Sequence, residues 1–118
     1  MQFLSLFTPA VPPHAPPDPA HMAQMGKLME DMVKAGVLVA TGGIKSRNTG
    51  MKITRRNGTV TVEQGPVNGS SLMPAAGYAL LRAKSREELV GHVEKFLQLA
   101  GDGTSEIIEV MESVPART

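Results

Sequence analysis

The sequence predicts a single α+β domain in which two helices cover one face of an antiparallel β-sheet. Two segments, one between Asp18 and Gly36 and one between Ser85 and Gly101, space their apolar residues as amphipathic helices do. Short apolar or alternating runs lie before, between and after them, which gives the order β-α-β-(β-hairpin)-β-α-β. Each helix is apolar on one side only, so both are expected on the same face of one sheet. At 118 residues the chain has room for one domain, residues 1–118.

The first strand and the first helix are separated by a proline-rich loop. Residues 2–7 form an apolar run that predicts a buried strand, and the five prolines of residues 9–17 indicate an extended connection. Asp18 is the expected N-cap of the helix, because Pro19 suits the first helical position, and Gly36 is expected to end it. The apolar stripe of this helix is predicted to comprise Met22, Met25, Met29, Met32 and Val33.

A β-hairpin is the clearest local signal in the chain. Residues 37–40 form a second apolar run with β-branched side chains, and a polar loop follows it. The alternating runs 51–56 and 59–63 then flank Asn57-Gly58. Because a type I′ turn needs positive φ angles that Asn and Gly accept, these runs are predicted to pair as a hairpin.

The second half of the chain repeats the strand–helix–strand pattern. Residues 76–83 predict a strand, and the spacing of Ser85 and Glu88 is that of a capping box at the start of the second helix. Residues 106–112 predict the last strand, whose apolar residues on both faces indicate a central position or a subunit contact. The buried face of the second helix is predicted to comprise Leu89, Val93, Phe96, Leu97 and Ala100.

The face of the sheet opposite the helices has no predicted cover. A chain with two helices on one face has no further element for the other face. Pairing two such sheets across a two-fold axis buries both, so a homodimer is expected.

Composition argues against several functions. The net charge is +1 and the aromatic residues number only three Phe and one Tyr, so neither a basic stripe nor a stacking platform for nucleic acid is expected. No apolar stretch approaches the ~20 residues that span a bilayer, and a cytoplasmic location is expected. Absence of cysteine excludes disulfides and thiol catalysis. His14 and His21 lack a third ligand, and the glycine-rich segments lack phosphate-loop spacing, so neither a metal nor a cofactor is expected.

Several segments together make the chain similar to the YCII-related family, including its branch named for a DGPF motif. The similarity rests on the opening strand, on PDPAHMAQMGKLMEDMVKAGVLVATGGI, on the hairpin with TVTVEQGPVNG, on AAGYALLRAKSREELVGHVEKF and on EIIEVMES. The resemblance implies a ferredoxin-like subunit whose sheets pair into a dimeric α/β barrel. This agrees with the uncovered sheet face inferred from the helices.

The same resemblance singles out His21. A histidine at the start of the first helix, paired with an aspartate, is the proposed catalytic site in other family members, and His21 stands at the matching position. The aspartate has no counterpart here, because the corresponding loop carries Asn48. The branch's DGPF motif is replaced by Gln64-Gly65-Pro66-Val67, so Gln64 can contribute hydrogen bonds but no proton transfer.

These observations predict a small apolar cleft bounded by the first helix and the 64–73 loop. On a helical wheel His21 lies beside Met25, so it is expected to point inward, either as a polar contact or general base or as a packing residue. Met25, Met29 and Tyr78 are the expected apolar walls, with Gln64 as a further contact. The first hypothesis is binding of a small aromatic or carboxylated metabolite. The alternatives are a lyase or isomerase in which His21 shuttles a proton on a lactone or hydroxylated ring, and a non-catalytic interaction module.

Three arginines and His92 are the remaining polar residues considered for a site. Arg55 and Arg56 are neighbours on a strand, so at most one of them can face a site, and Arg47 lies in a loop of undetermined path. His92 is expected to be solvated on the flank of the second helix.

Overall fold

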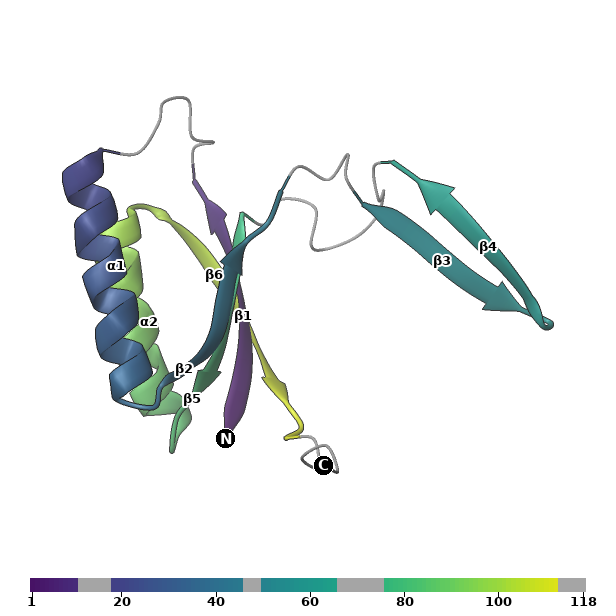
Figure 1. Ribbon diagram of the computed structural model, residues 1–118. Helices are drawn as coiled ribbons and strands as arrows, with labels where there is room; N and C mark the ends of the chain where they lie inside the picture. Colours follow the sequence, from purple (N-terminus) through teal and green to yellow (C-terminus); the bar gives the residue numbers. More distant parts are fainter. Residues whose placement is uncertain (11–17, 46–49, 66–75, 113–118) are drawn as a thin grey trace.

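The computed structural model describes residues 1–10, 18–45, 50–65 and 76–112. Strands β2, β5, β1 and β6 form, in that spatial order, one four-stranded sheet in which every neighbouring pair is antiparallel. Figure 1 shows both helices on one face of this sheet. The predicted α+β class is confirmed, and the arrangement is broadly compatible with a ferredoxin-like fold. The elements are β1 (Gln2–Pro9), α1 (Pro19–Lys34), β2 (Leu38–Gly43), β3 (Met51–Arg56), β4 (Thr59–Gln64), β5 (Gly77–Arg82), α2 (Arg86–Ala100) and β6 (Gly103–Val110).

Helix α1 begins and ends where the sequence predicts. The Asp18 carboxylate accepts a hydrogen bond from the Ala20 amide at 3.2 Å, and Pro19 is the first helical residue. Gly36, just after the helix, has φ +75°. The predicted apolar stripe is correct for Met25, Met29 and Met32 but wrong for Met22 and Val33, which are each 58% exposed because they lie together at one margin of the stripe.

Helix α2 has the predicted N-cap. The Ser85 hydroxyl accepts a hydrogen bond from the Glu88 amide at 3.1 Å. The Glu88 carboxylate, however, accepts from the Lys84 amide at 3.4 Å, one residue before the position that a capping box would use. The five residues predicted for its inner face are all buried or half-buried.

Removing the Ser85 cap is expected to destabilise the protein by about 1 kcal/mol, because the Ser85→Ala variant leaves a first-turn amide without its acceptor. Urea unfolding followed by circular dichroism measures this change as a lower midpoint at constant slope. A loss below about 0.3 kcal/mol would mean that water replaces the hydroxyl without cost.

The hydrophobic core lies at one end of the space between helices and sheet. Phe3 of β1 is 0% exposed and packs with Leu81 of β5, to which it is directly paired. Met32 near the end of α1 and Leu89 near the start of α2 close this cluster from the helical side. Toward the other end of the two helices the packing is incomplete, and that is where the cavity described below lies.

The hairpin β3–β4 forms a two-stranded sheet of its own, and the prediction of one sheet was wrong on this point. Its turn is as expected: Arg56 pairs with Thr59, and Asn57 and Gly58 have φ angles of 51° and 81°. The hairpin stays outside because β5 pairs directly with β2, which leaves no place between those strands. In Figure 1 the hairpin projects to the side of the sheet away from the helices.

Strand β6 is an edge strand. It runs from Gly103 to Val110, a shift toward the N-terminus from the predicted 106–112, and it pairs with β1 alone. A central position in the described sheet is therefore excluded, and the alternative prediction, a subunit contact, stays a prediction. Among the described residues, no helix has the length and apolar character needed to cross a membrane.

Candidate functional site

A cavity of about 480 Å³ lies between the two helices and the four-stranded sheet. Helix α1 lines it with residues one or two turns apart, among them His21, Met25 and Met29. These residues share one face because they are spaced four apart, which returns a helix close to the same direction. Helix α2 contributes Val93 and Phe96 in the same way.

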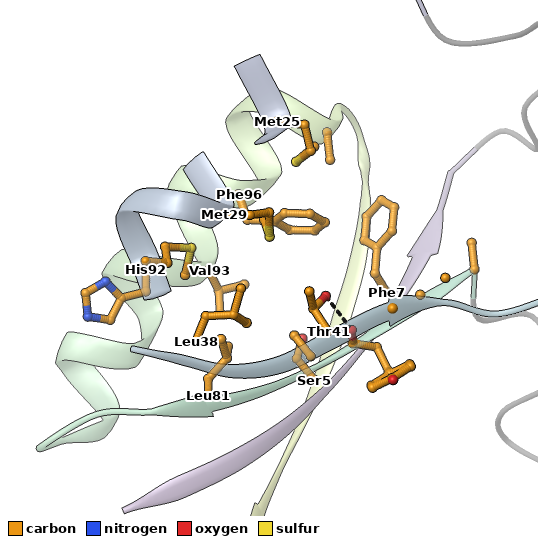
Figure 2. A pocket seen from close by; sticks show the side chains of 18 of the residues that line it. Ser5, Phe7, Met25, Met29, Leu38, Thr41, Leu81, His92, Val93 and Phe96 are labelled. Atoms are coloured by element: carbon orange, nitrogen blue, oxygen red, sulfur yellow. Dashed lines mark hydrogen bonds between the residues drawn. The ribbon is translucent and has the colours of Figure 1, made fainter. Parts of the chain in front are cut away.

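Two aromatic side chains from opposite layers meet at this cavity. Phe7 of β1 and Phe96 of α2 stand edge to face, with ring centroids 5.2 Å apart and ring planes at 89°. Figure 2 shows Met25, Met29 and Phe96 on the helical side, opposite Phe7 and the sheet. The walls are therefore two aromatic rings and flexible thioether side chains, which adapt their shape to a bound molecule.

Few polar side chains line this cavity. They are Ser5, Thr41, His21 and His92, and among the described lining residues none is Asp, Glu, Lys or Arg. The Thr41 hydroxyl donates to the Tyr78 carbonyl at 2.9 Å, so its proton already has an acceptor. His21 is half-buried in the first turn of α1, among the lining residues. It is thus available as a polar contact for a molecule in the cavity.

His92 was wrongly predicted to be solvated. Its side chain is only 23% exposed, its Nε2 atom lies 3.4 Å from the Glu88 carboxylate, and it belongs to the cavity lining. The reason is that α2 buries a face wide enough to include the position before Val93. In Figure 2, His92 lies at the margin of the cavity, away from Phe7.

Tyr78 was predicted as an apolar wall, but its ring lies on the opposite face of the sheet. Leu81 faces the helices, and Tyr78, three residues earlier on the same strand, must face the other way because side chains alternate. Its ring covers Gly42 of β2, where an added Cβ would lie 2.8 Å from the Tyr78 Cε1 atom. Tyr78 therefore contributes to the cavity through its main chain.

Gln64 is not placed at the cavity. It is the exposed last residue of β4, on the separate hairpin, and is absent from the described lining. The loop expected to bound the cleft lies outside the described residues from position 66 onward, as do His14, Arg47 and Asn48. Arg55 and Arg56 are both exposed and, as strand neighbours, point to opposite faces of the hairpin.

Sequence reasoning missed the sheet side of the cavity. Ser5 and Phe7 share a face with Phe3 by simple alternation, so the opening strand carried a usable signal. Thr41 carried none, because the pairing of β2 shifts register between Leu38 and Ala40 and so changes which residues face inward.

The chain matches no protein-family model and no curated protein. Within the described ranges, no three His, Asp or Glu side chains gather as a metal site would require. The lining of the cavity therefore determines the chemistry of the site. Its walls favour an apolar molecule, and its histidines, serine and threonine can hydrogen-bond one or two polar substituents.

Proposed function

We propose that the protein binds a small aromatic or carboxylated metabolite in the cavity between its helices and its sheet. The observation that carries this proposal is an apolar cavity of about 480 Å³, lined from both layers and holding few polar groups. Ligand pockets are typically ~300–1,000 Å³, mostly apolar, with a small number of orienting polar groups. An apolar molecule bound there would displace water from the apolar walls, which favours binding.

The lining defines the chemistry of the ligand. A flat ring fits between the edge-to-face pair Phe7–Phe96 and the side chains of Met25 and Met29, which offer π and thioether contacts. A carboxylate or hydroxyl on that ring would hydrogen-bond His21, which is the polar side chain of α1 in the lining. Because no cationic Lys or Arg occurs among the described lining residues, the ligand carries at most one negative charge.

The proposed assembly is a homodimer with the sheets face to face, as in the dimeric α/β barrels that the YCII resemblance implies. Support comes from the sheet face opposite the helices, which carries Leu4, Leu80, Tyr78 and Ile108. Tyr78 and Ile108 are exposed there, and a contiguous apolar face of this kind marks an interaction surface. The dimer leaves the cavity accessible, because cavity and open face lie on opposite sides of the sheet.

A thermal-shift screen tests the binding proposal. Aromatic acids, hydroxyquinones and small lactones are screened against the wild type, because a ligand of the folded state raises its melting temperature. We expect an aromatic acid to bind and His21→Ala to weaken it about tenfold, which corresponds to one hydrogen bond of about 1.4 kcal/mol. Met22→Ala, the exposed neighbour on the same helix, is the matched control and should leave affinity unchanged.

A cavity-filling variant locates the site. Ala100→Leu places a larger side chain in the lining of α2 and should abolish binding. Equal binding to Ala100→Leu, or no hit at all, would contradict the proposal. Turnover of a bound compound that is lost in His21→Ala, with stability retained, would instead favour the lyase or isomerase hypothesis.

A further inference from the structure

We propose that the β3–β4 hairpin is an arm that binds a second copy of this chain through its apolar face. Alternation along the paired strands gives the hairpin two unlike faces, since Ile53 pairs with Val62 and Thr54 with Thr61. The apolar face, called the arm face below, comprises Met51, Ile53, Arg55, Val60, Val62 and Gln64. The opposite face is polar throughout and comprises Lys52, Thr54, Arg56, Thr59, Thr61 and Glu63.

The arm face has no cover in its own subunit. Ile53 is 63% exposed, and Met51, Val60 and Val62 are each more than half exposed. Within the described residues, neither hairpin strand packs extensively against the helices or the four-stranded sheet. An isolated two-stranded hairpin is only marginally stable in water, so this one gains order by packing its apolar face against another surface.

Strand order places a suitable surface of the partner beside the arm. This inference rests on the proposed face-to-face dimer. The sheet order is β2-β5-β1-β6, and the hairpin follows β2 in the chain. A two-fold axis parallel to the strands sets the β2 edge of one subunit opposite the β6 edge of the other. Each arm then lies against the partner's β6 edge. The two arm contacts are identical, and the assembly ends at a dimer.

The β6 edge complements the arm face in polarity and in charge. Ile108 on the open face of β6 is 55% exposed, the greatest exposure among the large apolar residues of that face. Glu106, two residues away on the same face, is also exposed, and Arg55 is the charged residue of the arm face. Arg55 therefore meets Glu106 while Ile53 and Val62 cover Ile108.

The arm enlarges the surface available for a dimer. A hairpin with six residues per strand is about 20 Å long and 10 Å wide, and the open sheet face is about 20 Å by 20 Å. The sheet face alone therefore offers about half of the roughly 800 Å² that each partner buries in a standard interface, and the sheet face with the arm offers about three quarters.

Paired charge substitutions on the two faces of the hairpin test the arm. The variant I53K/V62E makes the arm face polar while its cross-strand Lys–Glu pair preserves hairpin pairing. The control T54K/T61E places the same pair on the polar face of the same strands. Sedimentation velocity over a concentration series gives the dimer dissociation constant of each full-length chain.

We expect a dimeric wild type, a dissociation constant raised roughly 100-fold or more in I53K/V62E, and a change below about threefold in T54K/T61E. A dimer unaffected by I53K/V62E but dissociated by Ile108→Lys would overturn the arm and retain the sheet-to-sheet dimer. A wild type that stays monomeric at about 100 μM would overturn both, and another protein or surface would then be the partner of the arm. Ligand binding is measured in a separate experiment, so failure of the binding proposal can be distinguished from failure of the arm or of the dimer.

A charge exchange tests the contact between Arg55 and Glu106. Arg55→Glu and Glu106→Arg should each weaken the dimer about tenfold, and the double variant R55E/E106R should regain most of the wild-type affinity. Additive weakening in the double variant would show that the arm does not lie at the partner's β6 edge.

Discussion

Replacing Phe3 by alanine is expected to destabilise the protein by about 3–5 kcal/mol, the range for removing a fully buried phenylalanine. Phe3 is 0% exposed and contacts both the sheet and the helices in the core cluster. The Arg86 guanidinium also lies 5.9 Å from the centre of its ring, so the substitution removes a cation–π contact as well. A domain of this size is stabilised by only ~5–15 kcal/mol, so a large part of its stability would be lost.

Urea unfolding of Phe3→Ala beside Met111→Ala measures this effect. Met111 is 95% exposed, and its truncation is expected to change stability by no more than about 0.5 kcal/mol. The Phe3→Leu variant keeps most of the apolar volume and should lose clearly less than Phe3→Ala. If Phe3→Ala lost under about 1.5 kcal/mol, the core would be collapsing into the removed volume rather than holding its packing.

Gly103→Val is expected to destabilise the protein by at least about 1–3 kcal/mol, although valine favours strands. Gly103 begins β6 opposite Pro9, and an added Cβ would lie 2.6 Å from both the Thr8 carbonyl oxygen and the Phe7 Cε1 atom. The carbonyl belongs to the neighbouring strand, so no side-chain rotation relieves the contact, and β1 must move away from β6. Because Phe7 lines the cavity, ligand affinity should fall in the same variant.

Two other glycines provide the matched control. Gly26 and Gly91 lie in α1 and α2, and a Cβ added at either meets nothing within 4 Å. Alanine at these positions should stabilise the protein by about 0.5–1 kcal/mol each, because glycine is a poor helix former. Thermal unfolding of Gly103→Val, Gly26→Ala and Gly91→Ala distinguishes the crowded glycine position from the two open ones. A Gly103→Val protein as stable as the wild type would show that β1 and β6 are farther apart than the structure has them.

The sequence alone predicted those features of the fold that depend on contacts between residues close together in the chain. Asp18 and Ser85 mark helix starts because their side chains bond amides two or three residues away. Asn57 and Gly58 specify the turn through their own backbone preferences. The inner faces of both helices follow from a period of 3.6 residues, so His21 and Met29 could be assigned to one side before any tertiary contact was known.

Strand faces in the second half of the chain were not determined in this way. Residues 77–82 carry apolar side chains on both sides of the strand, since Tyr78 and Leu80 alternate with Ala79 and Leu81. Such a pattern does not say which side meets the helices. The pairing of Leu81 with Phe3 decides it, and that pairing joins residues far apart in the chain.

What the amino-acid sequence determined by itself is the order of elements, the helix caps, the hairpin turn and the helical wall of the cavity, because each depends on neighbours within a few residues. Only the tertiary structure decided that β6 is an edge, that the hairpin stands apart from the main sheet, and that Thr41 lines the cavity. These features depend on which strands pair and in what register. Such pairing is fixed by long-range contacts that no local pattern encodes.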